Sequence, residues 1–214
     1  METVAICCRG KSLKSIDKLP HIDTFILVNE FTDELNIPGV KQVLNDTPIT
    51  HMFNWWNYTH IIPGMISNNF YTEYNVTSII SPYTKEVGRG LYSVQGRSGL
   101  IPCSYYPDEL KPYMWYNDNS TYKWDFPSCG NGAILYGAAL ARKEVHIIGL
   151  DFFQQGVHGY ASGAETTPGH DGNIMKKFLI EQVFEVFVDI NFYLYTCADV
   201  KDVPSNVKVI TVEQ

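Results

Sequence analysis

The chain has 214 residues, with 16 lysines and arginines against 23 aspartates and glutamates, and a formal net charge of -7. This length suits one substantial domain, or one domain with a small lid, rather than two separate cores. The acidic balance argues against nucleic-acid binding, which usually depends on a basic patch that neutralises phosphates. A small soluble substrate is therefore favoured.

The cysteines and the apolar stretches indicate the compartment. The five cysteines are an odd number and form no C-x-x-C pair, which favours neither a disulfide framework nor a zinc site. The apolar run near the start is too short for a signal sequence, and no later stretch is long enough to cross a membrane. We therefore expect a cytoplasmic protein without a transmembrane segment.

The first thirty residues have the pattern of an opening βαβ unit. A buried strand is expected at 4–8, a helix over 12–19 with Ser12 as its cap, and a second strand at 24–28. The turn Arg9-Gly10-Lys11-Ser12 ends like a P-loop, but Ala5 stands where a P-loop requires glycine. Two interpretations of this turn stay open: its backbone N–H groups hold a phosphate or sugar hydroxyl, or it is only a connection.

The middle of the chain is less regular. Further strands are expected at 39–44, 50–57 and 76–80. Residues 83–126 are rich in Gly, Pro, Tyr and Trp with little periodicity, which predicts an irregular insert lying over the sheet. Its aromatic content favours either substrate binding or a subunit interface, and with the latter a homo-oligomer.

Regular structure returns at residue 127. Gly130 and Gly132 lead into a predicted helix of small residues at 133–141, which is followed by a buried strand at 144–150 and by the longest helix at 171–190, with Asp171 as its cap. Closing strands are expected at 192–197 and 207–212, and residues 152–170 form a short lid loop. The chain is thus predicted to be a single α/β domain over 1–214, Rossmann-like, with a mainly parallel, doubly wound sheet.

Polar residues follow several of the predicted strands. Arg9, Asn29, Asn54 and Asp151 all stand at or near strand ends, which meet at one edge of a parallel sheet. Such an edge suits neutral hydrogen bonds to a nucleoside or sugar, although either asparagine alone would also serve a turn. Because no carboxylates cluster around Asp151, the sequence favours a reaction without a metal or other cofactor.

His170 is the candidate general base. It precedes a predicted helix start, where the positive pole of the helix disfavours imidazolium and keeps the ring able to accept a proton. His158, in a Gly-rich loop, is the alternative, and His146 is expected to pack inside its strand. Cys129 is a conceivable nucleophile, but the small residues around it favour a buried structural thiol.

Several short motifs follow one another along the chain: G-x-S-L-x-x-I-D from Gly10, Asn29, S-C-G at 128–130, GLDFFQQG at 149–156, Tyr160 and Gly169-His170. Their order and spacing resemble those of the bacterial lipooligosaccharide sialyltransferases of glycosyltransferase family 42. The resemblance is strongest over 128–197 and weak between about 60 and 125. It implies an inverting, metal-independent glycosyltransferase that moves sialic acid or a related acidic sugar from a CMP donor to a glycan hydroxyl.

The resemblance also implies roles for single residues. Tyr160 would contact the leaving phosphate, and His170 would take the proton from the acceptor hydroxyl. The asparagines would contact the nucleotide, the turn at 128–130 would hold the nucleotide sugar, and residues 151 and 152 would lie against the cytidine. The expected donor-binding residues are Arg9, Gly10, Asn29, Asn54, Ser128, Cys129, Gly130, Asp151 and Phe152.

Four positions depart from the family pattern. Arg9 replaces an asparagine, Cys129 a serine, and Phe153 and Thr167 replace tyrosines. These changes fit a phosphate contact moved to Arg9, a different CMP-linked acidic sugar, or a loss of activity. Two other functions stay open: a non-catalytic nucleotide- or glycan-binding protein of the same fold, and a Mg-dependent nucleotide or pterin phosphotransferase relative.

Overall fold

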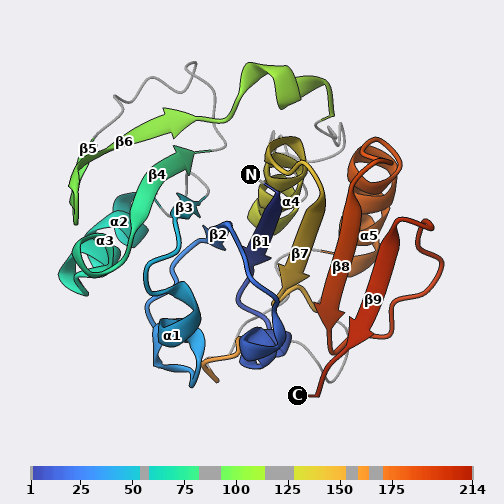
Figure 1. The fold of residues 1–214 in the computed structure, drawn as a ribbon, viewed down its shortest axis with the longest axis horizontal. Helices are drawn as coiled ribbons and strands as arrows, with labels where there is room; N and C mark the ends of the chain where they lie inside the picture. Colours follow the sequence, from blue (N-terminus) through green and yellow to red (C-terminus); the bar gives the residue numbers. More distant parts are fainter. Residues whose placement is uncertain are drawn as a thin grey trace.

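A single sheet runs through the computed structural model, which describes residues 2–53, 58–81, 93–113, 128–152, 159–163 and 171–213. The described residues contribute nine strands to it, in the order β5-β6-β4-β3-β2-β1-β7-β8-β9 (Figure 1). The strands are β1 (Thr3–Cys7), β2 (Thr24–Val28), β3 (Ile49–Met52), β4 (Val76–Ser81), β5 (Ser93–Gly96), β6 (Gly99–Tyr105), β7 (Glu144–Ile148), β8 (Asn191–Thr196) and β9 (Val207–Thr211).

All neighbouring strands are parallel except β5 and β6, which form an antiparallel hairpin at one edge. The central strands are short, apolar and buried on both faces, as parallel strands covered by helices usually are. Val4 of β1 pairs with Thr24 of β2 on one side and with Val145 of β7 on the other. The predicted mainly parallel, doubly wound sheet is confirmed.

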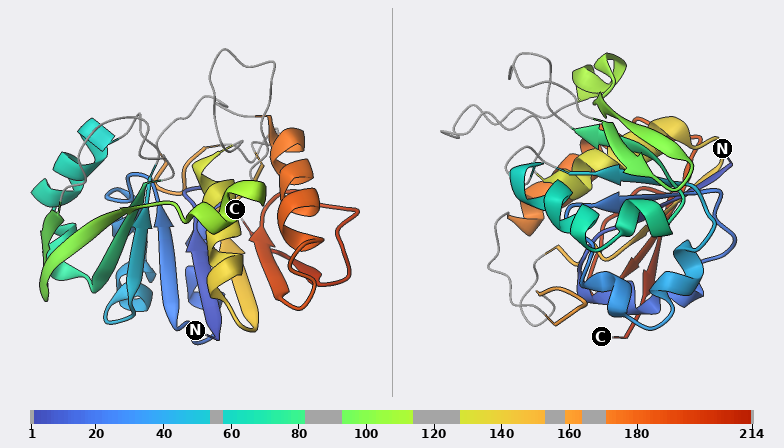
Figure 2. Two further views of the ribbon diagram at one scale, coloured as in Figure 1. Left: turned by 90° about the horizontal axis from the view of Figure 1, so that it is seen from above. Right: turned by 90° about the vertical axis from the view of Figure 1, so that its left-hand side faces the viewer.

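Helices cover both faces of the sheet (Figure 2). One apolar cluster lies under α4, α5 and the π-helical turn η6, and the other lies under η1, α1, α2 and α3. The helical elements are η1 (Lys11–Lys18), η2 (Glu34–Asn36), α1 (Val40–Leu44), α2 (Tyr58–Ser67), α3 (Phe70–Glu73), η5 (Asp108–Tyr113), α4 (Cys129–Leu140), α5 (Gly172–Leu179) and η6 (Ile180–Phe184).

Several predicted elements need correction. Residues 39–44 were expected to be a strand but form α1, because Val40 and Leu44 are one helical turn apart and bury together beside η1. The first helix is a 3-10 helix capped by Gly10, and the Ser12 hydroxyl instead accepts a hydrogen bond from the Gly149 N–H. The helix predicted over 171–190 ends as an α-helix at Leu179 and continues as η6.

Within residues 83–126, where an irregular insert was expected, the structure describes the strands β5 and β6 and the 3-10 helix η5.

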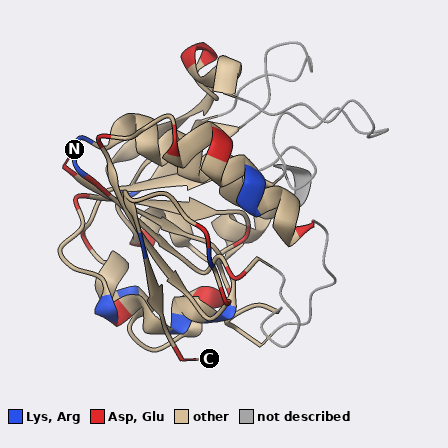
Figure 3. Ribbon diagram, turned by 90° about the vertical axis from the view of Figure 1, so that its right-hand side faces the viewer, with Lys and Arg blue, Asp and Glu red and all other residues tan. Residues whose placement is uncertain are grey.

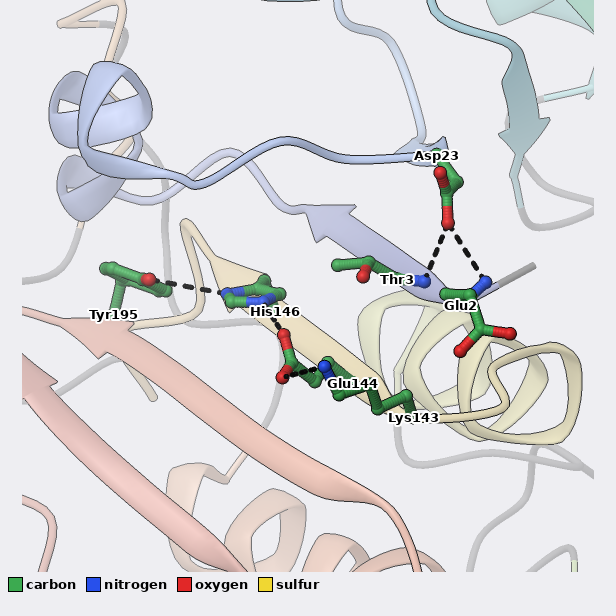
Figure 4. Close-up of polar contacts among 7 residues, drawn as sticks. All are labelled: Glu2, Thr3, Asp23, Lys143, Glu144, His146 and Tyr195. Carbon is green, nitrogen blue, oxygen red and sulfur yellow. Dashed lines mark hydrogen bonds and ion pairs between the residues drawn. The ribbon is translucent and has the colours of Figure 1, made fainter.

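Polar contacts join the start of β1 to the residue before β2, and others lie along β7 around His146 (Figure 4). Asp23 accepts hydrogen bonds from the N–H groups of Glu2 and Thr3 at 2.9 and 3.0 Å, and these bonds lower its pKa. His146 stacks on Tyr193 with ring centroids 4.7 Å apart, and burial lowers its pKa. The expectation that His146 packs inside its strand is confirmed.

The charged residues are dispersed. On the side that Figure 3 shows, acidic and basic residues are scattered over the described ribbon and do not form one basic stripe. Within the described ranges, none of the helices has the length and apolar character that crossing a membrane requires.

Candidate functional site

Between β1 and β7 the strand order of the sheet reverses, and the carboxyl ends of these two strands mark this switch point. The chain leaves β1 toward β2 on one side and leaves β7 toward β8 on the other, so the two connections separate above this pair of strands. In open α/β sheets such a switch point is where ligands bind. Gly10 and Asp151, which the sequence resemblance predicts to bind the donor, lie beside this switch point.

The two loops at the switch point approach each other closely. The Cys8 N–H donates to the Ile148 carbonyl at 2.8 Å, and the Gly10 N–H donates to the Gly149 carbonyl at 2.7 Å. Gly149 has a φ of +78°, and a Cβ there would overlap the Cys8 carbonyl. A Cβ at Gly10 would lie 2.5 Å from the Asp151 carboxylate. Glycine is therefore required at both positions.

Asp151 ties three elements together beneath this edge. Its carboxylate accepts hydrogen bonds from the Ser12 N–H, the Thr196 hydroxyl and the Cys197 N–H, each at 3.0 Å. The side chain is buried, so these three donors compensate a charge that water barely reaches. The contacts of Asp151 among the described residues are thus internal, and its contact with cytidine stays a prediction.

Residues 128–130 lie at the start of α4, on the same edge. The Ser128 hydroxyl oxygen accepts a hydrogen bond from the Asn131 N–H at 3.1 Å and so caps the helix. The Cys129 thiol lies 3.8 Å from the Met52 carbonyl at the end of β3, and burial raises its pKa well above that of a free thiol. A Cβ at Gly130 would lie 3.1 Å from the sulfur of Cys8.

This placement has two consequences. The positive pole of α4 points to the carboxyl edge of the sheet, where it favours an anion. The raised pKa keeps Cys129 a thiol, which supports its interpretation as structural rather than nucleophilic.

Asn29 ends β2 in the left-handed conformation, with a φ of 60°. Its N–H donates to the Met52 carbonyl at 2.8 Å, and its carbonyl lies 2.7 Å from His51 Nε2. Because a carbonyl only accepts, Nε2 carries the proton, and Nδ1 accepts from the Tyr71 hydroxyl at 2.8 Å. The side-chain oxygen of Asn29 is buried and has no hydrogen-bond partner within the described part of the chain.

Burial of His51 fits this hydrogen-bonding pattern. The ring is fully buried, and burial lowers its pKa to about 4. His51 and Tyr71 were not singled out from the sequence. A histidine inside a predicted strand was the available signal, but nothing local shows that it reaches Asn29.

Arg9 and Tyr160 form a second group near Gly10. Arg9 Nε lies 3.0 Å from Glu34 Oε2, and the guanidinium carbon lies 4.1 Å from the centre of the Tyr160 ring. The Ser162 hydroxyl donates to Glu34 Oε1 at 3.1 Å. Burial raises the pKa of Glu34, and the nearby charge of Arg9 opposes that rise. Glu34 was missed because it lies on a short 3-10 turn without periodicity.

Phe152 follows Asp151 with a φ of 52° and a buried side chain. A Cβ at Gly172, the first residue of α5, would overlap the Phe152 carbonyl oxygen. The backbone of residue 152 is thus packed directly against the start of α5. Its predicted role beside the cytidine stays a prediction.

Other predicted positions lie outside the described residues: Asn54, His158 and His170, together with the departures Phe153 and Thr167. Among the residues that are described, no group of three or more His, Cys, Asp or Glu side chains is arranged to hold a metal ion.

The architecture is that of a Rossmann-like α/β protein whose sheet has a switch point between β1 and β7. No family model matches the sequence, and the search of curated proteins found no match. Among solved structures, the sialyltransferase CST-II in complex with a trisaccharide acceptor and CMP has a TM-score of 0.58 and 17% identity, over 90% of this chain and 80% of that chain.

Two further structures of CstII, from Campylobacter jejuni, are also similar. The complex with the substrate analogue CMP-3FNeuAc has a TM-score of 0.55 and 18% identity, over 91% of this chain and 81% of that chain. The complex with cytidine-5'-monophosphate has a TM-score of 0.56 and 18% identity, over 91% and 79%. The chain therefore has the fold of CstII, and the fold implied by the sequence resemblance is confirmed.

Proposed function

We propose that this protein is an inverting, metal-independent glycosyltransferase that moves sialic acid or a related acidic sugar from a CMP donor to a glycan hydroxyl. One observation carries the proposal. Predicted donor-binding residues from β1, β2, α4 and β7 lie along the carboxyl edge around the switch point of a fold that CstII shares, and CstII was solved with CMP. In this proposal the protein acts in the cytoplasm without a resident cofactor.

The donor would bind between the start of α4 and the end of β2. The N-terminus of α4 offers backbone N–H groups and a positive pole to the phosphate. Asn29 brings a buried side-chain oxygen that lacks a hydrogen-bond partner within the described ranges, which a hydroxyl or amino group of the nucleoside would satisfy. Both contacts are neutral, as expected for a site that binds the donor without a metal.

Transfer would proceed by direct displacement. His170 would take the proton from the acceptor hydroxyl as that oxygen attacks the anomeric carbon and the bond to the CMP phosphate breaks. His170 directly precedes Asp171, whose carboxylate caps α5 by accepting from the Asn173 N–H at 2.8 Å. Tyr160 would donate a hydrogen bond to the departing phosphate, on which negative charge grows.

The first prediction concerns His170. Replacing His170 with Ala should lower the rate of sugar transfer from CMP-sialic acid by about a hundredfold or more, because general-base catalysis typically contributes that much. CMP affinity should stay within a few-fold, since the base acts on the acceptor rather than on the donor. Release of CMP and formation of the sialylated glycan are the two readouts.

His158→Ala is the matched control, because His158 is the alternative base. Full activity in H158A together with its loss in H170A supports the proposal. The reverse pattern would move the base to His158, and CMP release without any glycan product in the wild-type protein would limit the activity to donor hydrolysis. Addition of EDTA should leave transfer unchanged, and transfer that requires Mg²⁺ would contradict the metal-independent mechanism.

A further inference from the structure

We propose that Arg9 is a positioning residue: paired with the buried Glu34, it holds residues 159–163 on the end of β1 and so sets the orientation of Tyr160. We call this arrangement of Arg9, Glu34, Tyr160 and Ser162 the Arg9 latch. That Arg9 holds residues 159–163 in place requires no assumption about activity. The expected effect of the latch on the rate of sugar transfer rests on the proposed function.

The backbone link between the two segments is short. Gly10 pairs with Tyr160 in an isolated antiparallel bridge, and the Ala161 N–H donates to the Arg9 carbonyl at 2.8 Å. The Gly163 N–H closes a turn onto the Tyr160 carbonyl at 3.0 Å. A single bridge of this kind orders few residues, so its position depends on the side chains around it.

Those side chains connect both segments to one carboxylate. Glu34 Oε2 lies 3.0 Å from Arg9 Nε, and Glu34 Oε1 accepts from the Ser162 hydroxyl at 3.1 Å. The Arg9 guanidinium in turn covers the Tyr160 ring, a cation–π contact at 4.1 Å from the ring centre. Glu34 thus connects the two segments of the latch, through Arg9 in one and Ser162 in the other.

The burial of the pair explains why Arg9 remains there. The Glu34 side chain is 0% exposed and the Arg9 side chain 13% exposed. If Arg9 moved away to contact a phosphate, the Glu34 carboxylate would be left buried without its cation, which is strongly unfavourable. The negative charge of Glu34 also offsets the attraction of Arg9 for an anion. We therefore assign Arg9 an indirect role through Tyr160, in place of the direct phosphate contact expected from the sequence.

Hydrogen exchange tests the latch without any assay of activity. In Arg9→Met, the Ala161 amide should exchange about tenfold faster or more, because the segment loses the contacts of the Arg9 guanidinium with Glu34 and with the Tyr160 ring. The amides of β1 and β7 serve as internal controls and should not change. The double variant Arg9→Met/Glu34→Gln removes both charges, so it keeps the test valid if Arg9→Met alone fails to fold. An unchanged rate at Ala161 in a folded variant overturns the latch.

A double-mutant cycle tests the route through Tyr160. Tyr160→Phe removes the hydroxyl but keeps the ring that Arg9 covers. Arg9→Met alone should lower kcat by roughly tenfold or more, with the donor KM little changed, because a misplaced group costs rate rather than binding. In the Tyr160→Phe background the same change should cost less than about threefold, since the positioned hydroxyl is already absent.

Two outcomes separate this inference from its alternatives. Additive effects of Arg9→Met and Tyr160→Phe, or a rise confined to the donor KM, would show that Arg9 contacts the phosphate directly and would overturn the indirect role. If the wild-type protein transfers no sugar, the proposed function fails, while the exchange rate at Ala161 still decides whether the latch exists.

Discussion

Asn29 depends on His51 for its position. Asparagine adopts the left-handed conformation more readily than most residues other than glycine. The hydrogen bond from His51 Nε2 to the Asn29 carbonyl, together with the bond from the Asn29 N–H to the Met52 carbonyl, holds the backbone of Asn29 in place. Tyr71 completes the arrangement by donating to the other ring nitrogen.

The neutral state of His51 predicts a pH dependence of stability. Folding lowers its pKa from 6.5 to about 4. Above pH 6.5 both states are neutral, whereas between pH 6.5 and about 4 only the unfolded chain takes up the proton. The free energy of unfolding should therefore fall by up to about 3 kcal/mol across this window as the pH is lowered. Denaturant unfolding at several pH values measures it.

His51→Gln is the comparison for this prediction, because glutamine keeps an N–H donor but does not titrate. The variant should show a flatter pH profile over the same window. His146, whose pKa is also lowered, is present in both proteins and cancels in the difference. Equal slopes in the two proteins would mean that His51 does not titrate as its burial implies.

For single residues, the sequence predicted where they lie in the fold but not which residues they contact. Asp151 and Asn29 could be placed at the sheet edge because each follows an apolar run that had to be a strand. The partners of Arg9 and Asn29 could not be predicted, since Glu34 and His51 reach them only through the packing of the fold. Arg9 pairs with Glu34 and covers the Tyr160 ring, and no local sequence pattern indicates either contact.

Helix α4 links stability to the proposed donor site through one side chain. Ser128 caps its N-terminus with a hydrogen bond of 3.1 Å from the Asn131 N–H. Replacing Ser128 with Ala should lower the free energy of unfolding by about 1 kcal/mol, because one N–H at the helix start loses its partner. Thermal or denaturant unfolding measures the change.

Ser128→Thr keeps the hydroxyl and is the matched control. It should unfold within about 0.5 kcal/mol of the wild-type protein. An equal loss in both variants would attribute the effect to packing rather than to the cap. If the proposed donor site is correct, CMP affinity should fall in the alanine variant as well.

Elements with strong periodicity or clear flanking signals were predictable, whereas the short run at 39–44 was mistaken for a strand. The small residues at 133–141 follow a glycine-rich segment and predicted a helix, and α4 covers Cys129–Leu140, so the glycine-rich segment forms its first turn. Val40, Val43 and Leu44 are compatible with a strand or a helix, and packing beside η1 decides for the helix. The π-helical turn at Ile180–Phe184 has no sequence signature, because it depends on how α5 meets the sheet.

Across the whole molecule, the α/β class followed from the alternation of strands and helices. The strand order did not, because it is fixed by pairings between segments far apart in the chain, such as Val4 with Val145. The position of β1 at the centre, and hence the switch point between β1 and β7, emerges only from the folded sheet. The antiparallel hairpin of β5 and β6 within the predicted insert was likewise not apparent from its composition.

Binding of CMP tests the central claim most directly. Isothermal titration should show CMP binding tighter than UDP or GDP by about tenfold or more, equivalent to about 1.4 kcal/mol. The same affinity should be measured in EDTA and in Mg²⁺, because the proposed contacts are protein N–H groups and an asparagine. Absence of CMP binding, or binding that requires Mg²⁺ and does not prefer CMP, would contradict the account.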